Sequence, residues 1–476
     1  VRLGYTALAI TDRNTLAGIV RGHGAAVDAE LQYIVAAELT FDDAPPCVVW
    51  IRNRSAYASL CRLLTLGRRQ ASKGNCRLSF EDLVSHGDEF LLGVIPDWNR
   101  LSMGTASDHH RVHAAANLSD AADLQRYYDM FGERCYLLAE LHRGSTDQQR
   151  LDLLQELSQQ TCLPLVATGD VYYHDPSHAR LQDVLTAIAH GCTVHDIGPY
   201  QFANAQRHMR PLEDIAQLFQ QIPQAFERTR EIADICRFSL SELRYEYPEE
   251  LAPTNITPMA YLKQLAWKGA HDRYPRGISR KVINLLQHEL ELIGELHYEA
   301  YFLTVWDLVR FARSQDILCQ GRGSAANSVV CFCLGVTSVD PDTTQLLFER
   351  FLSRERAEAP DIDVDFEHER REEVLQYLYE KYGRDRAGMT GVVTTYRLRS
   401  AVREVGKALG FSADLVDGIA KNLDGRITEG DLDLRCREVG LDPDELAGER
   451  FVELVEMLRG MPRHLSQHVG GMVITK

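Results

Sequence analysis

The sequence predicts a multi-domain α/β protein, and three observations lead to this prediction. Short apolar segments alternate with amphipathic ones along the first half of the chain, which is typical of strands alternating with helices. A run of alternating acidic and apolar residues between positions 361 and 366 predicts a further strand. With 476 residues, of which 45% are hydrophobic and 25% charged, the chain is long enough for two to four domains.

In the first half, up to about Phe238, the apolar segments have the length of strands and the segments between them the length of helices. The expected strands are Thr6–Thr11, Tyr33–Ala36, Cys47–Ile51, Phe90–Ile95, Tyr136–Glu140 and Leu163–Thr168. The expected helices are Leu16–Ala29, Ser55–Ala71, Asp120–Phe131 and Asp147–Thr161. This alternation predicts a parallel sheet, and the number of units favours a barrel.

Acidic residues follow three of these expected strands. In a barrel of this kind the chemistry is located where the strands end. Asp12, Glu38 and Asp170 are therefore candidate ligands of a metal centre, and His174 and His178 lie close by in the sequence.

A polar segment rich in Glu and Pro, Ser239–Thr257, predicts a linker after this barrel. The segment that follows it, Pro258–Tyr298, is expected to be helical. The remainder of the chain contains the two motifs that carry the strongest chemical signal.

The first motif is a glycine-rich turn. We expect a short strand at Ile317–Cys319, a flexible turn at Gly321–Ser324 and a helix at Ala325–Leu334. A glycine-rich turn that opens a helix presents free backbone N–H groups and the positive end of the helix dipole, so it predicts phosphate binding. Arg322 and the Ser324 hydroxyl would add charge-assisted contacts. A plain helix start capped by Ser324 is the alternative interpretation.

The second motif is an acidic strand about forty residues further along the chain. Three aspartates alternate with three apolar residues: Asp361, Asp363 and Asp365 with Ile362, Val364 and Phe366. Period-two alternation places the carboxylates on one face of a strand. Like charges roughly 7 Å apart repel each other, so we expect a cation beside them. Enzymes that transfer nucleotides hold Mg²⁺ with one or two carboxylates and the oxygens of the substrate.

Two other interpretations of the acidic run remain open. It could be a half-exposed strand with a solvated acidic face. It could also be a calcium loop, since Glu372 stands at the twelfth position counted from Asp361. However, the sixth position of such a loop requires glycine, and this chain has Phe366 there.

Three arginines lie between the two motifs: Arg350, Arg354 and Arg356. Arginines so close to a carboxylate cluster are either its salt-bridge partners or further ligands of a triphosphate. The sequence does not separate these two roles.

Contact with nucleic acid is expected to be local, because the chain has a formal net charge of −16. Between Lys381 and Gly410, seven basic residues outnumber two acidic ones. The basic residues are Lys381, Arg384, Arg386, Arg397, Arg399, Arg403 and Lys407. The last four are expected to form a stripe that contacts the phosphates of DNA, with a solvated basic helix face as the alternative.

These motifs carry a resemblance to a known family. GRGSAANS, LLFERFLSRER and PDIDVDF resemble the palm of the bacterial family C polymerases, that is, the alpha subunit of DNA polymerase III and its relatives. Further segments are similar to the error-prone, damage-induced branch of that family: RYEYPEEL, DVDFEHERREEV, TYRLRSAVREVGKALG and HLSQHVGGMVI. The resemblance extends over essentially the whole chain.

The resemblance implies roles for individual residues. Asp363 and Asp365 match two of the three catalytic metal ligands, and Gly323 and Ser324 match residues that contact the phosphates of the incoming nucleotide. Asp361 matches a family residue that is not one of the catalytic carboxylates. The family's third catalytic aspartate lies beyond the segment His468–Ile474, so we expect this chain to be a piece of a longer protein, cut at both ends.

The resemblance also implies a domain organisation. Residues 1–238 would be a PHP domain, a distorted barrel that lacks its first strand here. Residues 239–299 would be a linker and helical lead-in, 300–394 the palm core, 395–463 an inserted helical thumb and 464–476 the start of the returning palm segment.

Active PHP domains bind a cluster of metals and hydrolyse phosphoesters. This chain has Arg13 and Tyr172 where the family motif has histidine, and an arginine repels a cation instead of ligating it. The site at Asp12, Glu38 and Asp170 is therefore expected to be vestigial, and the barrel to serve as a structural platform.

The function implied is that of an error-prone DNA polymerase in damage tolerance, which uses Mg²⁺, dNTPs and a DNA primer-template. A sliding clamp and other damage-response proteins are expected partners, through parts outside this chain, which alone is expected to be inactive. A PHP-type phosphoesterase and a non-catalytic DNA-binding scaffold are the alternatives. Eleven scattered Cys residues and no apolar run of membrane-spanning length favour a cytoplasmic location.

Overall fold

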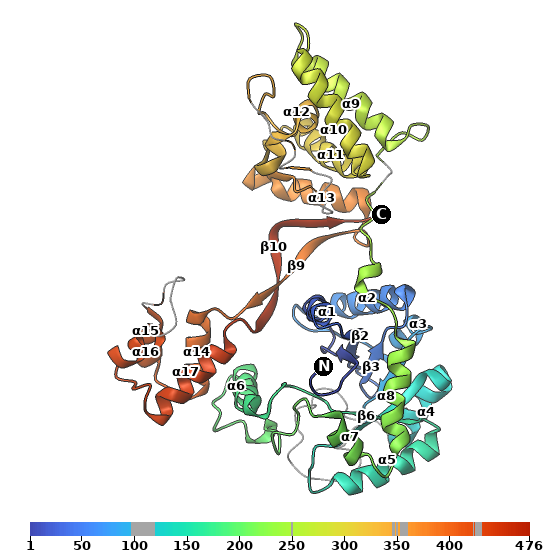
Figure 1. The fold of residues 1–476 in the computed structure, drawn as a ribbon, viewed down its shortest axis with the longest axis vertical. Helices are drawn as coiled ribbons and strands as arrows, with labels where there is room; N and C mark the ends of the chain where they lie inside the picture. Colours follow the sequence, from blue (N-terminus) through green and yellow to red (C-terminus); the bar gives the residue numbers. More distant parts are fainter. Residues whose placement is uncertain are drawn as a thin grey trace. The chain divides into compact units, whose positions relative to one another are not determined.

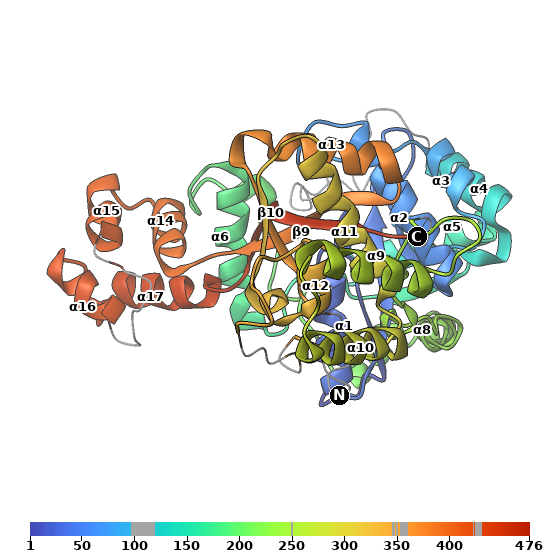
Figure 2. The same ribbon diagram turned by 90° about the horizontal axis from the view of Figure 1, so that it is seen from above.

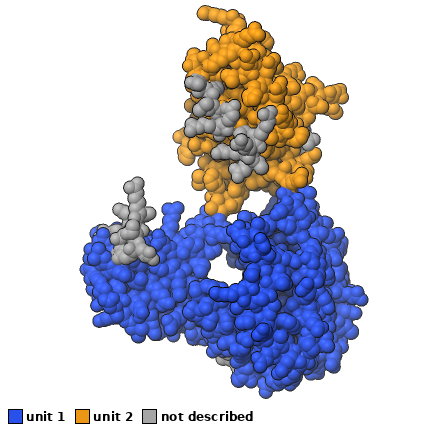
Figure 3. Space-filling view, viewed as in Figure 1, with its two compact units in different colours: residues 1–243, 393–466 blue, residues 244–392, 467–476 orange. Residues whose placement is uncertain are grey.

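The computed structural model describes residues 1–96, 120–248, 251–344, 348, 351–352, 360–421, 423 and 431–476. The chain divides into two compact units (Figure 3). Unit 1 contains Val1–Leu243 and Val393–Ser466, and unit 2 contains Arg244–Val392 and Gln467–Lys476. Both units contain helices and strands, so the predicted α/β class is confirmed at this level.

A six-stranded sheet forms the centre of the first part of unit 1 (Figure 1). Its strands are β1 (Ala7–Ile10), β2 (Gln32–Leu39), β3 (Cys47–Trp50), β4 (Leu91–Val94), β5 (Cys135–Glu140) and β6 (Leu165–Thr168). They lie side by side in chain order. Each of the six predicted strands is thus present, with bounds that differ by a few residues.

The direction of β3 corrects the prediction of an all-parallel sheet. β3 pairs antiparallel with both β2 and β4, whereas the β1–β2, β4–β5 and β5–β6 pairs are parallel. Only seven residues connect β2 to β3, and a parallel connection needs a dozen or more. Among the described residues no pairing joins β6 to β1, so the described strands of the expected distorted barrel form an open sheet.

Helices cover both faces of this sheet. They are α1 (Ile19–Asp28), α2 (Arg54–Arg69), α3 (Phe80–His86), α4 (Asp120–Phe131), α5 (Asp147–Thr161), α7 (Leu212–Leu218) and α8 (Pro223–Ile235). On one face Val35, Ala37 and Leu39 of β2 join a core built with α2 to α5. On the other face Ile34 and Ala36 pack with residues of α8. Since successive side chains of a strand point to opposite faces, a strand buried on both sides is apolar throughout.

The second part of unit 1 is helical. It contains α14 (Leu398–Ala408), α15 (Ala413–Lys421), α16 (Asp431–Glu438) and α17 (Leu446–Leu458). These helices gather into one group in both views (Figures 1 and 2). They share an apolar core with α6 (Ala179–His190), in which Val402, Val405 and Phe451 are buried.

Unit 2 has a helical core beside a small sheet. Its helices are α9 (Pro258–Arg273), α10 (Arg280–Glu295), α11 (Glu299–Ser314), α12 (Val329–Cys333) and α13 (Arg371–Tyr382). Strands β7 (Cys319–Arg322) and β8 (Asp363–Phe366) pair antiparallel. The apolar residues Ile362 and Val364 pack against the core formed by α9 to α12. The predicted helical segment Pro258–Tyr298 therefore corresponds to α9 and α10.

A second two-stranded sheet joins β9 (Ala387–Thr395) and β10 (Pro462–Ile474). In unit 2, Ala387 of β9 and Ile474 of β10 are buried together with Leu378 and Tyr382 of α13.

None of the helices in the described part of the chain combines the length and the apolar character needed to cross a bilayer.

Candidate active site

The candidate site is built on the antiparallel pairing of β7 and β8 in unit 2. In its register Gln320 lies opposite Asp365 and Arg322 opposite Asp363. Position 321, between Gln320 and Arg322 on β7, requires glycine, because a Cβ atom there would lie 2.7 Å from the Val336 carbonyl oxygen. On β8 the apolar side chains of Val364 and Phe366 pack on the protein core, so the two aspartates point away from it.

One arginine bridges the two aspartates of β8. The Nη1 atom of Arg322 lies 3.4 Å from Asp363 Oδ2, and its Nε atom lies 3.1 Å from Asp365 Oδ2. The hydrogen bond with Asp365 and the charge of Asp363 raise the pKa of the Arg322 guanidinium. One cationic side chain thus contacts both carboxylates, and metal binding by them stays a prediction.

The predicted strand is longer than the observed one, which corrects the placement of Asp361. β8 begins at Asp363, and Asp361 lies before it. The backbone oxygen of Asp361 accepts a hydrogen bond from the Ser324 hydroxyl at 3.1 Å. Asp361 thus contacts the glycine-rich turn through its main chain, outside the strand that carries the other two aspartates.

The glycine-rich turn lies directly beside the acidic strand. Gly323 has a φ of 71°, a left-handed conformation that glycine adopts without strain. A Cβ atom at Gly323 would lie 3.6 Å from Asp363 Oδ2, so the main chain passes close to that carboxylate. The structure thus brings Arg322, Gly323 and Ser324 together with β8, although about forty residues separate them in the sequence.

The expected helix at Ala325–Leu334 is wrong in its start and its length. β7 extends through Arg322, and residues Gly323–Asn327 form a short 3₁₀ helix. The α-helix α12 begins only at Val329, because Ser328 has an extended conformation and its hydroxyl accepts a hydrogen bond from Cys331 N. No long helix therefore opens at the glycine-rich turn.

The N-terminus of α12 is already occupied by a carboxylate of the protein. Glu289 of α10 is completely buried and accepts hydrogen bonds from Val329 N, at 2.8 Å, and from Val330 N, at 2.9 Å. The Ser328 hydroxyl donates to the same carboxylate at 2.9 Å. The helix dipole predicted to bind phosphate is therefore used inside the fold. No local pattern pointed to Glu289, because its partners lie about forty residues away.

The arginines expected between the two motifs, Arg350, Arg354 and Arg356, lie outside the described residues. Their two proposed roles stay predictions.

Comparison with known proteins places this geometry in context. Residues 260–476 match the family model of the bacterial DNA polymerase III alpha NTPase domain. The chain is 55% identical to an error-prone DNA polymerase from Rhodopirellula baltica over 99% of its length, and 47% identical to one from Methylococcus capsulatus, also over 99%. Residues 260–476 are thus similar to the bacterial DNA polymerase III alpha family, and the chain as a whole is similar to error-prone DNA polymerases. The resemblance to the error-prone branch of this family is confirmed by the names of these relatives.

The chain spans only part of these polymerases, namely 41% and 43% of the length of the two relatives. A putative metal-dependent phosphoesterase from Bifidobacterium adolescentis is similar in structure over 36% of this chain and 78% of its own, with 14% identity and a TM-score of 0.26. A TM-score this low supports no conclusion about fold or chemistry.

Two of the four residues in the predicted DNA-contacting stripe, Arg399 and Arg403, are engaged within unit 1. Arg403 pairs with Asp417 at 3.2 Å. Arg399 donates to the carbonyl oxygens of Ala420, at 3.0 Å, and Lys421, at 3.1 Å, at the end of α15. The Arg397 side chain is exposed, as is that of Lys407. DNA contact by these four residues stays a prediction.

Lys381, which begins the same basic segment, is used inside unit 2. It forms an ion pair with Asp307 of α11, a residue only 1% exposed. Tyr377 and Arg310 also donate to this carboxylate, each at 2.6 Å. Burial raises the pKa of Asp307, but these three hydrogen bonds more than offset it and lower the pKa below its usual value. Lys381 is therefore a structural residue that joins α13 to α11.

The candidate metal ligands of unit 1 are each engaged by another group of the chain. Asp12 Oδ2 accepts a hydrogen bond from Gly18 N at 2.9 Å. Glu38 pairs with Arg13 at 3.0 Å, and Asp170 forms an ion pair with the buried Arg207. Nowhere in the described part of the chain do three or more His, Cys, Asp or Glu side chains gather in an arrangement that could hold a metal ion.

Two further residues of this region were not found from the sequence. Arg207 stacks over the Phe202 ring at 4.3 Å in addition to its pairing with Asp170. His142 is buried, and its Nε2–H donates to the Gly169 carbonyl at 3.1 Å. Burial, together with the charge of Arg207, lowers the pKa of His142 to about 4. His142 is therefore neutral at pH 7. No motif in the sequence indicated that this histidine would be buried.

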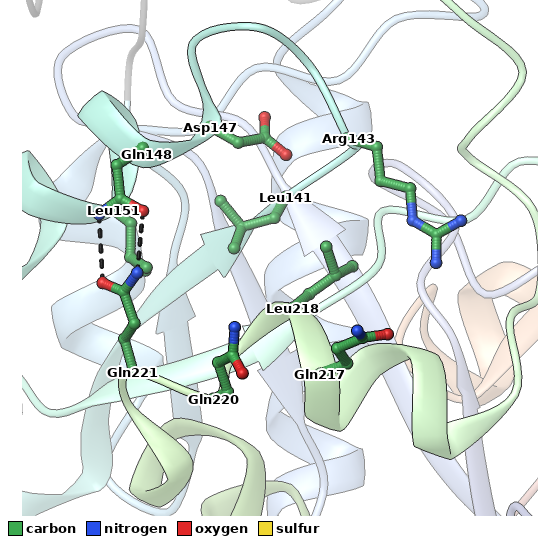
Figure 4. A pocket seen from close by; sticks show the side chains of 9 residues that line it. All are labelled: Leu141, Arg143, Asp147, Gln148, Leu151, Gln217, Leu218, Gln220 and Gln221. Carbon is green, nitrogen blue, oxygen red and sulfur yellow. Dashed lines mark hydrogen bonds between the residues drawn. The ribbon is translucent and has the colours of Figure 1, made fainter.

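Unit 1 also contains a cavity of about 470 Å³ (Figure 4). It is lined by Leu141, Arg143, Asp147, Gln148, Leu151, Gln217, Leu218, Gln220 and Gln221. The side chains of Gln148 and Gln221 bond to each other reciprocally, at 3.2 and 3.0 Å (Figure 4). Burial raises the pKa of Asp147. The cavity has an amide-rich lining, and none of its lining residues belongs to the predicted polymerase site.

Proposed function

We propose that the whole protein to which this chain belongs is an error-prone DNA polymerase that extends the 3′ end of a DNA primer with dNTPs during damage tolerance. The observation that carries this proposal is the pair of exposed carboxylates on β8, bridged by one guanidinium and placed beside a glycine-rich turn. The names of the relatives support the same activity. A cytoplasmic location and a sliding-clamp partner belong to this proposal as well.

The residues present fit a divalent ion. Asp363 and Asp365 supply hard oxygen ligands, and the Arg322 guanidinium, itself a cation, contacts both carboxylates. Mg²⁺ is commonly held by one or two carboxylates together with phosphate oxygens, so a pair is sufficient when the nucleotide supplies the rest. When bound, such ions would activate the attacking hydroxyl and neutralise charge on the leaving pyrophosphate.

Arg322 has two roles in this proposal. Without nucleotide it neutralises the two aspartates, and with nucleotide its guanidinium turns to the triphosphate. The exchange is feasible because the side chain is exposed and its ion pairs lie in solvent, where such pairs are weak. Gly323, with no side chain, lets the phosphates approach the main chain, and the Ser324 hydroxyl donates to a phosphate oxygen. Arg350 and Arg356 are proposed as further phosphate ligands.

The domain names follow from the same proposal. The β7–β8 region and its helices would form the palm core, the α14–α17 group the thumb, and the six-stranded sheet of unit 1 a PHP-like platform. Hydrolysis of phosphoesters is not part of the proposal, because Glu38 and Asp170 are each neutralised by an arginine.

Primer extension by the whole protein tests the proposal. Asp363→Asn/Asp365→Asn should lower the extension rate at least about a hundredfold, a loss typical of removed transition-state stabilisation. Glu369→Gln/Glu380→Gln is the matched control, since it removes the same charge from exposed positions of unit 2. The assignment fails if the aspartate variant extends primers as well as the control does. If the unaltered protein does not extend primers, the scaffold alternative gains support.

A further inference from the structure

A second basic segment, stronger than the one on α14, lies in unit 1. Residues 52–79 contain seven basic residues and no acidic one, in a chain whose net charge is −16. The basic residues are Arg52, Arg54, Arg62, Arg68, Arg69, Lys73 and Arg77. Such a local surplus is typical of a surface that meets an anionic partner.

The helix in this segment separates its charges from its apolar residues. α2 buries Ala56, Leu60, Leu63, Leu64 and Gly67 in the core of the sheet. Arg62 and Arg69 are seven residues apart, so they lie on the same side of the helix, opposite this buried face. Both are exposed, and Lys73 extends the surface just beyond the end of α2.

The charges on this face are not neutralised by carboxylates of the described residues. Arg62, Arg69 and Lys73 pair with no described residue. Arg68 donates to the Asn14 carbonyl oxygen at 2.7 Å, a contact that leaves its charge uncompensated. Arg77 differs, because it forms an ion pair with Asp42 at 2.6 Å. This is the reverse of α14, where Arg403 is paired with Asp417.

We propose that the face of α2 formed by Arg62, Arg69 and Lys73 binds the phosphate backbone of DNA without reading its sequence. Two arginines seven residues apart on a helix are separated by about 10.5 Å, roughly the axial rise of three nucleotides of one strand. Thr65 lies between them on this face and Ala58 one turn before Arg62; both are small, so neither offers an aromatic ring for base stacking. The choice of DNA over an acidic protein rests on the proposed function.

Binding of fluorescein-labelled DNA to this chain, measured by fluorescence anisotropy over a range of salt concentrations, tests the inference. The probes are a 20-nucleotide single strand and a 20-base-pair duplex of arbitrary sequence. Arg62→Gln/Arg69→Gln should weaken binding about tenfold at 0.1 M salt. The slope of log K against log salt should fall by about two for the duplex, or somewhat less for the single strand.

The matched control is Arg77→Gln/Arg237→Gln, which removes the same charge from arginines that pair with Asp42 and Asp234. We expect this variant to retain nearly all of the salt slope. The inference is overturned if both double variants lose DNA binding equally, or if the Arg62/Arg69 variant keeps the parental slope of log K against log salt. It is also overturned if the unaltered chain binds polyglutamate but binds neither the single-stranded nor the duplex DNA. The DNA-binding test involves no dNTP and no catalysis. A negative primer-extension result therefore does not decide the DNA-binding result, and a negative DNA-binding result does not decide whether the whole protein extends primers.

Discussion

Asp363 and Asp365 of β8 pair with an arginine, and so do Glu38 of β2 and Asp170, which follows β6, but the carboxylates differ in exposure. The side chains of Asp363 and Asp365 are 46% and 66% exposed, and their partner Arg322 is 58% exposed. The side chains of Glu38 and Asp170 are only 11% and 13% exposed, and Arg207 only 10%. The Asp170–Arg207 pair is therefore enclosed and the pairs of Arg322 are solvated, while Arg13, the partner of Glu38, is 43% exposed.

Depth decides whether such an arginine can be exchanged for another cation. In water an ion pair contributes little, so metal ions and a triphosphate can displace Arg322 at small cost. Removing one partner of a buried pair leaves a charge without compensation and costs several kcal/mol. The pair at β8 can therefore serve as a site that opens for a ligand, whereas the Asp170–Arg207 pair of unit 1 stabilises the fold.

The largest expected effect comes from breaking the buried pair. Arg207→Gln should lower the free energy of unfolding by about 3–5 kcal/mol, because it removes the positive charge that is paired with the largely enclosed Asp170. Asp363→Asn should change it by no more than about 1 kcal/mol. Urea denaturation followed by circular dichroism measures both. The double variant Asp170→Asn/Arg207→Gln should recover part of the lost free energy of unfolding. Equal effects of Arg207→Gln and Asp363→Asn would refute the distinction between enclosed and exposed ion pairs.

The pH dependence of stability should sharpen the same contrast. His142 has a pKa of about 4 in the fold and an ordinary value of 6.5, so between these values the unfolded chain binds more protons than the folded one. The contribution of neutral His142 to the free energy of unfolding is therefore fully present above pH 6.5. It is lost as the pH falls to about 4, and its magnitude is on the order of 3 kcal/mol.

His142→Gln, which keeps a donor for the Gly169 carbonyl, should flatten this part of the stability profile. Asp363→Asn/Asp365→Asn is the control and should retain the parental profile over the same range. Denaturant titrations between pH 4 and 7.5 decide the matter. A His142→Gln profile as steep as that of the parent would show that other groups produce the slope.

The smallest expected effect concerns Arg322. If its guanidinium occupies the place of a metal ion, Arg322→Gln should tighten the binding of Mn²⁺, a spectroscopic substitute for Mg²⁺, by up to about fivefold, which corresponds to ~1 kcal/mol. Electron paramagnetic resonance of free Mn²⁺ measures the affinity. When Asp363→Asn/Asp365→Asn is also present, Arg322→Gln should no longer change the Mn²⁺ affinity. If Arg322→Gln alone leaves the Mn²⁺ affinity unchanged, the guanidinium does not occupy the place of the metal ion.

Local patterns predicted many elements of the fold correctly. The predicted bounds of α4 and α5 agree with those observed, and the strand cores at residues 7–10 and 47–50 lie within the predicted segments. These elements depend on apolar periodicity over a few turns, which is visible in the sequence. The antiparallel direction of β3 was also predictable, since seven residues cannot form a helical crossover.

The candidate site was only partly accessible in this way. Alternation placed Asp363 and Asp365 on one face, and the glycines marked the neighbouring turn. The bridging position of Arg322 and the capping of α12 by Glu289 depend on contacts between residues about forty positions apart. No local pattern encodes such contacts.

The two basic segments illustrate what each level of description can decide. Composition alone identifies both α2 and α14 as positively charged, and the sequence by itself determined the family resemblance, the acidic strand and the helical periodicities. Only the tertiary structure decided that Arg403 is neutralised by Asp417, that Arg62 and Arg69 are not paired with described residues, and that Asp170 is enclosed with Arg207. The physical reason is that burial and pairing set the effective strength of a charge, and both are properties of how distant segments pack together.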